Sequence, residues 1–144
     1  MSEAQLGLLR TLIRQGQDAE ALQQITLLLN EPAAPAELFE LRAEIEARQG
    51  RLETAVQSLE MAIALAPNRA EARIAHARLR LRMRQPDLAR QEIAVLLKQM
   101  PDSIAVRLLD AGLHEQLGDR DGTISRLREI FLLDQNQSDA LGRL

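Results

Sequence analysis

The residues that could do chemistry are few in this chain, and they stand far apart. His76 and His114 are the only two histidines, and cysteine is absent, which excludes thiol catalysis, disulfides and cysteine-based metal sites. Two histidines that share a metal need an i,i+4 spacing or a carboxylate at a fixed offset, and neither is present. The stretch GDRDGT, 118–123, lacks the ligand series and closing Glu of a calcium loop. We interpret it as a turn in which Asp119 caps the next helix.

Sequence patterns of known catalytic sites are also missing. There is no Walker A loop, no G-x-G-x-x-G and no G-x-S-x-G. Carboxylate pairs such as Glu40 and Glu44 are i,i+4 neighbours, a spacing typical of a solvated helix face. The sequence therefore predicts neither an enzyme nor a bound cofactor or metal.

Composition excludes further classes and favours helices. The net charge is −3, whereas nucleic-acid binding generally needs a basic surface that displaces counterions. No apolar run of membrane-spanning length occurs, and the start MSEAQLGLLR has no signal-peptide pattern, so membrane insertion is not expected and a cytoplasmic or a periplasmic location stays open. With two Phe, no Tyr and no Trp, the core must rely on small and aliphatic residues such as Ala and Leu, which are strong helix formers. An all-α fold is predicted.

The chain repeats itself every 34 residues without a gap. The columns in register are Gly16, Gly50, Arg84 and Gly118; Ala21, Ala55, Ala89 and Thr123; Ile25, Leu59, Ile93 and Leu127; Leu28, Ala62, Leu96 and Ile130; and Leu9, Ala43, Ala77 and Ala111. Small residues suit a close approach of two helices, and glycine suits the left-handed residue that ends a helix. Each repeat is therefore predicted to be a pair of helices.

This pattern resembles the tetratricopeptide repeat (TPR) family. Repeat two fits best, with the family's positions 4, 8, 20, 24, 27 and 32 filled by Phe39, Ala43, Ala55, Leu59, Ala62 and Pro67. The resemblance implies an all-α solenoid of antiparallel helix pairs stacked into a right-handed superhelix. It predicts a single array over 2–137, with repeats at 2–35, 36–69, 70–103 and 104–137, and the start of a capping or fifth-repeat helix at 138–144.

Two family positions that usually pack between helices are polar here. Position 7 holds Arg42, His76 and Asp110 in repeats two to four, and position 11 holds Glu46, Arg80 and His114. The array is therefore expected to be looser or locally rearranged. Repeat three also has Arg84 in place of the turn glycine, so Pro86 is expected to help stop the preceding helix.

In the TPR family the first helices line a concave groove that binds partners. Carried over position by position, the resemblance places in this groove Arg10, Arg14, Glu37, Glu40, Glu44, Arg48, Ile74, Arg78, Arg82, Leu108, Gly112 and Gln116. The predicted groove is mixed in charge, and repeat three is its basic island. Gly112 is unusual inside a helix, so it either admits a ligand backbone or relieves crowding.

The resemblance implies a non-catalytic scaffold or adaptor that binds a peptide or a partner protein, for which an acidic segment would match the arginines. Bacterial complex assembly, in the envelope, in secretion or in polysaccharide export, is the expected setting. Two alternatives stay open. The chain could be the TPR region of a larger protein, such as a glycosyl- or sulfotransferase, or it could form homo-oligomers through uncapped apolar ends that include Phe131, Leu132 and Leu133. The sequence does not identify the partner.

Overall fold

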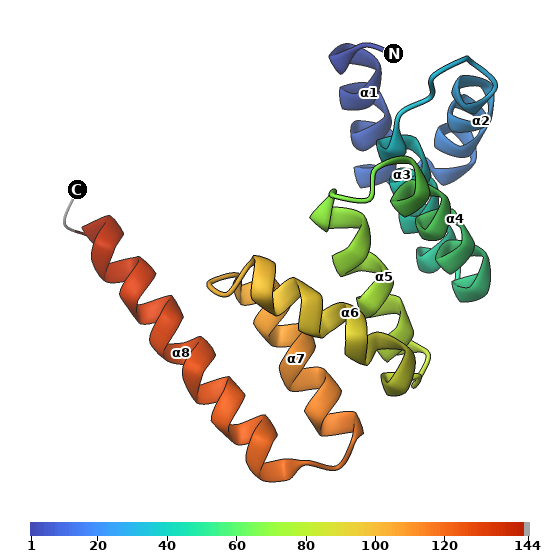
Figure 1. Cartoon of the computed structure of the whole chain (residues 1–144). Coiled ribbons are helices and arrows are strands. Elements are labelled where there is room, and N and C mark those ends of the chain that lie inside the picture. The colour runs from blue at the N-terminus through green and yellow to red at the C-terminus, as the bar shows by residue number, and fades with distance from the viewer. Residues whose placement is uncertain (143–144) are drawn as a thin grey trace. The chain divides into compact units, whose positions relative to one another are not determined.

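Eight α-helices make up the secondary structure of residues 1–142, the part of the chain that the computed structural model describes; side chains are described for 1–138. No strand occurs in this range, so the predicted all-α fold is confirmed. Successive helices are joined by turns and short loops (Figure 1). Within these residues, no helix has the length and apolar content needed to span a membrane.

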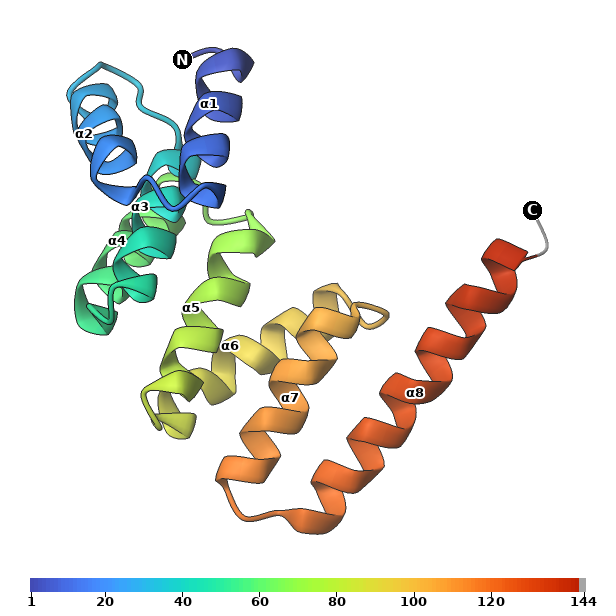
Figure 2. The ribbon, with the colours of Figure 1, turned by 180° about the vertical axis from the view of Figure 1, so that it is seen from behind.

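The helices belong to two compact units, Met1–Ala72 and Arg73–Leu144. The first unit contains α1 (Glu3–Arg14), α2 (Asp18–Leu29), α3 (Ala36–Arg48) and α4 (Leu52–Leu65). The second contains most of α5 (Ala70–Arg82), and then α6 (Pro86–Gln99), α7 (Ile104–Gln116) and α8 (Arg120–Gly142). Views from the front and from behind both place α3 beside α4 and α7 beside α8 (Figures 1 and 2). Each pair is a helical hairpin.

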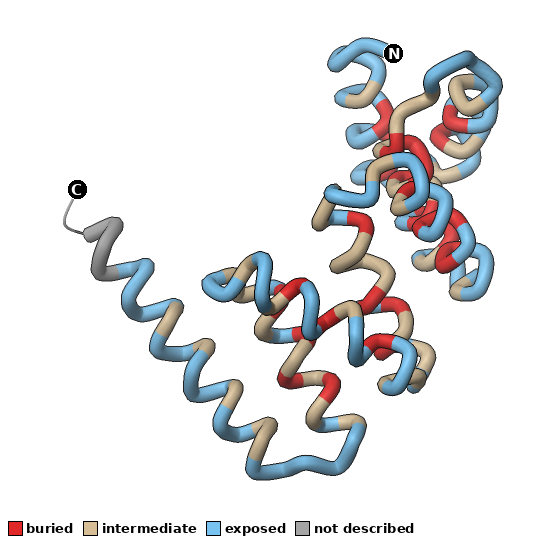
Figure 3. Tube along the Cα trace, in the orientation of Figure 1, coloured by how far each residue is buried: buried red, intermediate tan, exposed pale blue. Residues whose placement is uncertain are grey.

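The core of the first unit lies between α1, α2 and α3. Leu9, Ile25, Leu38 and Ile45 are completely or almost completely buried there, and Ala21 at the small-residue column has no exposed surface. Buried positions lie along one face of α1 and of α2 (Figure 3), whereas α3 also buries Ala36 and Phe39 in a second cluster with Ala62 of α4. Since an alanine at zero exposure leaves no room for a larger side chain, this column sets the distance between the helices.

The core of the second unit has the same plan and is built from α5, α6 and α7. Ala77 and Ala89 are fully buried at the small-residue columns, and Ile93 lies between them and Leu109 and Leu113 of α7. The apolar residues therefore bury one repeat's second helix against the next repeat's first helix, as a repeat array requires.

The turn inside repeat three keeps the geometry of a glycine turn without a glycine. Gly50 has a φ of 81°, and Arg84, at the equivalent position, has a φ of 60°. The N–H of Arg84 donates to the Leu81 carbonyl at 3.0 Å, matching the 3.0 Å bond from Gly50 to Ala47. The turn itself therefore ends α5, while Pro86 occupies the first turn of α6. A left-handed residue with a Cβ costs about 1 kcal/mol, so Arg84 stores strain.

The last helix begins as predicted but does not end as predicted. Asp119 caps α8, because its Oδ1 accepts the N–H of Gly122 at 2.9 Å. The helix then continues without a break to Gly142, so the prediction that a new helix starts at 138 is wrong for 138–142, and 143–144 lie outside the described residues. The physical reason is that 123–141 contains no Pro or Gly, the residues that end helices elsewhere in the chain.

Candidate partner-binding surface

The twelve residues predicted to line the groove lie at the surfaces of the two units, and none of them is buried. The exposed ones are Arg10, Arg14, Glu44, Arg48, Arg78, Arg82 and Leu108, and the half-buried ones are Glu37, Glu40, Ile74, Gly112 and Gln116. Their polar groups divide into two sets. Side chains of one set form hydrogen bonds or ion pairs with other residues of the same unit, and those of the other set extend into solvent.

Arg69 holds two of the three predicted groove carboxylates. Its Nε and second terminal nitrogen donate to the two Glu40 oxygens at 2.6 and 3.0 Å, and its other terminal nitrogen lies 3.0 Å from Glu37 Oε1. The hydrogen bond to Glu40 is the main reason that the pKa of Arg69 is raised above its ordinary value, against the effect of burial. Only Glu44 therefore keeps a solvated carboxylate on this face of α3.

Two other predicted groove residues connect successive first helices. In the first unit, Arg48 at the end of α3 donates to the Ile13 carbonyl of α1 at 3.0 Å and pairs with Asp18. In the second unit, the Gln116 side-chain amide of α7 donates to the Leu81 carbonyl of α5 at 2.6 Å. Each of these carbonyls already accepts one backbone N–H, from Gly16 and from Arg84, and its second lone pair and partial negative charge suit the side-chain donor. At repeat position 13, Arg48 and Gln116 therefore connect two repeats and are not free groove residues.

Three predicted groove arginines remain fully available. Arg10 and Arg14 are exposed on α1, and Arg78 is exposed on α5. None of the three forms an ion pair or hydrogen bond among the side chains described for 1–138. Arg10 and Arg14 stand one turn apart on the same helix face. These three arginines are therefore exposed cations on the first helices, where Glu44 is an exposed carboxylate.

Gly112 is not required by crowding. A Cβ added there would meet Leu81 Cδ1 at 3.6 Å, which is ordinary van der Waals contact. Leu108, one turn earlier on α7, is 51% exposed. An alanine would therefore fit at this position, so crowding against a Cβ does not explain the glycine. Close approach of a ligand backbone to Gly112 stays a proposal.

In repeats two to four, the polar residue at position 7 is paired with a side chain of the same repeat. In repeat two, Arg42 Nε donates to Ser58 Oγ at 3.0 Å and lies 3.3 Å from Glu46 Oε1, and Ser58 donates to the same Glu46 oxygen at 2.8 Å. Glu46 and Ser58 are both buried. In repeat three, His76 Nδ1 lies 2.6 Å from Glu92 Oε2.

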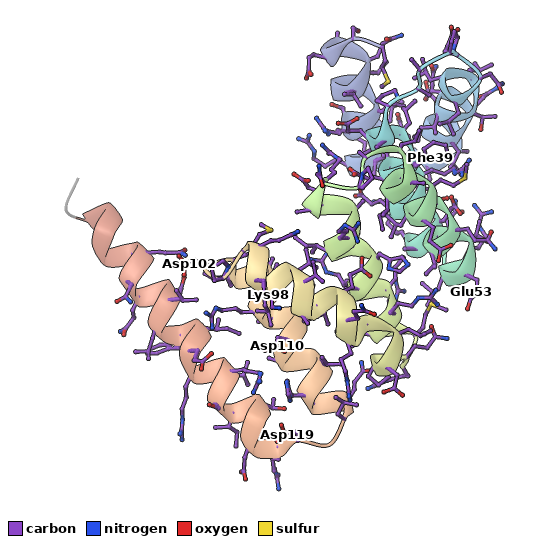
Figure 4. All side chains as sticks on the ribbon, in the orientation of Figure 1. Phe39, Glu53, Lys98, Asp102, Asp110 and Asp119 are labelled. Carbon is purple, nitrogen blue, oxygen red and sulfur yellow. The ribbon has the colours of Figure 1, made fainter. Side chains whose placement is uncertain are left out.

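Repeat four uses the same positions with the opposite polarity. Asp110 of α7, labelled in Figure 4, accepts from Arg126 Nε of α8 at 2.6 Å, and His114 lies 3.5 Å from the other Asp110 oxygen. Position 7 therefore meets position 23 in three successive repeats. The local rearrangement expected from the sequence is this set of polar contacts.

Sequence reasoning missed the position-23 partners and Arg69. The position-23 partners could have been found from the sequence. Ser58, Glu92 and Arg126 are 34 residues apart, and each complements the residue at position 7 of its own repeat. Arg69 ends repeat two, outside the positions that the family comparison assigns to the groove. Among the described residues, no group of three or more His, Asp or Glu side chains is arranged to hold a metal ion.

Paired helices whose small-residue columns recur along the chain define the α-solenoid class of repeat proteins. Residues 46–113 match the family model described as tetratricopeptide repeat. No curated protein matches the chain. Residues 46–113 thus match the tetratricopeptide repeat family, and the resemblance drawn from the sequence is confirmed.

Three solved structures illustrate the shared fold. MamA from Desulfovibrio magneticus RS-1 is 17% identical with a TM-score of 0.81, covering 92% of this chain and 75% of that one. A tetratricopeptide repeat protein from Parabacteroides merdae is 22% identical with a TM-score of 0.79, covering 94% and 56%. YrrB, described as a TPR protein with an unusual peptide-binding site, is 17% identical with a TM-score of 0.77, covering 97% and 72%.

Proposed function

We propose that the chain is a non-catalytic interaction module whose first helices bind a peptide or a partner protein with an acidic segment. The observation that carries the proposal is the division of charge on these helices. Glu37 and Glu40 are both paired with Arg69, whereas Arg10, Arg14 and Arg78 are exposed and have no internal partner. Guanidinium groups bind carboxylates through paired hydrogen bonds, which favours an acidic ligand over a basic one.

The three similar structures support the proposal in general terms. YrrB is described as having a peptide-binding site, and the relatives from Desulfovibrio magneticus and Parabacteroides merdae are bacterial. We extend the proposal to assembly of a bacterial complex, in the envelope, in secretion or in polysaccharide export. Affinity capture from the source organism, followed by mass spectrometry, identifies the partner.

Charge reversal on α1 tests the proposed surface directly. The probe is a fluorescent peptide that alternates Glu with Ala, titrated with the full chain at low and at physiological salt. Arg10→Glu with Arg14→Glu is expected to weaken binding at least about tenfold, and added salt to weaken wild-type binding. The matched control is Arg90→Glu on α6, whose side chain is 61% exposed and lies on a second helix.

The result can also contradict the proposal. Equal affinity of the wild type and the Arg10→Glu/Arg14→Glu variant would remove α1 from the binding surface. An equal loss in the Arg90→Glu control would show a general charge effect instead of a site. Arg78→Glu tests the second unit in the same way.

A further inference from the structure

The outer face of α8 carries an uncovered heptad seam. On one side of this helix, six residues follow one another at alternating spacings of four and three. We name this set the α8 seam; its members are Arg120, Ile124, Leu127, Phe131, Asp134 and Ser138. The three apolar members are 43%, 48% and 62% exposed. This spacing is the one at which two helices interlock their side chains. Exposed residues run along α8 in Figure 3, on the side away from its contacts with α7.

Equivalent positions in other repeats are covered. Leu127 occupies the column of Ile25 and Ile93, which are 0% and 1% exposed because a following first helix packs on them within the same unit. On α8 the apolar column is kept, but no helix of the second unit lies on it. A large exposed aromatic such as Phe131 in an apolar patch marks an interaction surface.

We propose that the α8 seam binds the α8 seam of a second copy of this chain, antiparallel and related by a two-fold axis near Leu127. In that arrangement position 120 of one copy faces position 134 of the other, seven residues on either side of the centre. Arg120 then meets Asp134 of the second copy at both ends, Ile124 lies beside Phe131 of the second copy, and the two Leu127 side chains meet at the centre. The seam is thus complementary to itself in charge and in hydrophobicity, as a two-fold interface requires.

The other end of the chain does not offer a matching surface. In repeats two and four, positions 3, 6 and 10 of the first helix pack on the preceding repeat, and in α3 they are the buried Leu38, Leu41 and Ile45. In α1 the same positions hold Ala4, Gly7 and Thr11, all exposed. Because these residues bring little apolar surface, head-to-tail stacking of α8 on α1 of another copy is disfavoured.

Sedimentation of the full chain tests the proposed dimer. A single helix face gives a small interface, so loadings from about 5 µM to about 1 mM cover the expected range. Phe131→Glu is expected to weaken self-association at least about a hundredfold, since it places two charges in the seam of each dimer. The matched control is Leu27→Glu on α2, since Leu27 is 63% exposed and lies outside the seam.

Charge exchange tests the antiparallel register. Arg120→Asp and Asp134→Arg each create two like-charge contacts per dimer, and each is expected to weaken self-association about tenfold. An equimolar mixture of these two variants restores both attractive contacts in the heterodimer, so it is expected to associate like the wild type. Circular dichroism of every variant checks that the helices are retained.

Two outcomes overturn the inference. A wild-type chain that stays monomeric over the whole concentration range shows that a second copy does not occupy the seam, and that some other segment or partner does. A wild-type dimer whose two charge variants do not recover on mixing shows that the copies pair in another way. Neither outcome bears on acidic-peptide binding by α1, so the two proposals are tested separately.

Discussion

Asp110 on α7 and Arg126 on α8 meet at 2.6 Å, at the same two repeat positions that bring His76 to Glu92. The Asp110 side chain is 13% exposed and that of Arg126 is 33% exposed, so the pair is only partly solvated. The contact replaces the apolar packing that tetratricopeptide repeats usually have at position 7. Its contribution to stability can be measured.

Removing one member of this pair should cost more than removing both. Arg126→Leu is expected to lower the free energy of unfolding by about 1–2 kcal/mol, because Asp110 loses its main partner in a site shielded from water. Asp110→Leu with Arg126→Leu should recover most of that loss, since two leucines can pack together. Urea unfolding of the single and double variants measures the coupling. Additive losses would mean that the two side chains do not interact.

Replacing the strained turn residue in repeat three should stabilise the chain. Arg84→Gly is expected to raise the free energy of unfolding by about 0.5–1 kcal/mol, because glycine adopts a φ of 60° without the penalty of a Cβ. Arg84→Ala is the control, since it removes the charge and keeps the Cβ. A gain of the same size in Arg84→Ala would assign the effect to charge, not to backbone strain.

The α8 cap should lose its contribution at low pH. The N–H of Gly122, followed by His114, lowers the pKa of Asp119 below its ordinary value. A lowered folded-state pKa stabilises the fold above the ordinary carboxyl pKa, and this contribution is lost as the pH falls through the folded-state pKa. Asp119→Ala should therefore be destabilising at pH 7, and its difference from the wild type should shrink in acid. Asp119→Asn keeps a capping oxygen and is the control for charge.

Replacing Gly112 with alanine should raise the stability of the chain and allow its effect on peptide binding to be measured separately. Gly112→Ala is expected to raise the free energy of unfolding by about 0.5–1 kcal/mol, because alanine is the better helix former and its Cβ fits at 3.6 Å from Leu81. Weaker peptide binding by this more stable variant would indicate that a ligand approaches the helix there. Gly7→Ala on α1, with no atom within 4 Å of the added Cβ, is the matched control.

The period of the sequence was sufficient to predict the helix pairs, because the columns of small and apolar residues depend only on local spacing. Polar partners were harder to predict. Arg69 reaches Glu40 from 29 residues away, and Arg48 reaches Ile13 from 35 residues away, so these contacts exist only once the helices are stacked. The predicted groove therefore included side chains that the fold itself already uses.

Arg84 illustrates a different limit of prediction from the sequence. The glycine column indicated where a left-handed residue was needed, and the arginine there suggested that the turn would change. The structure keeps the turn, because the two hydrogen bonds that close it, from Arg84 to Leu81 and from Gln85 to Arg80, involve only backbone atoms. A favourable backbone arrangement outweighed the preference of a single residue.

The pairs between positions 7 and 23 also bear on how a chain of similar helices finds its correct partners. Their polarity changes from one repeat to the next, so two of the wrong hairpins would bring like charges together. Pairing α7 with α6 in the hairpin manner would set Asp110 against Glu92, and pairing α3 with α8 would set Arg42 against Arg126. Like charges brought together out of water are costly. The same contacts that replace apolar packing thus disfavour the pairing of α7 with α6 and of α3 with α8 as hairpins during folding.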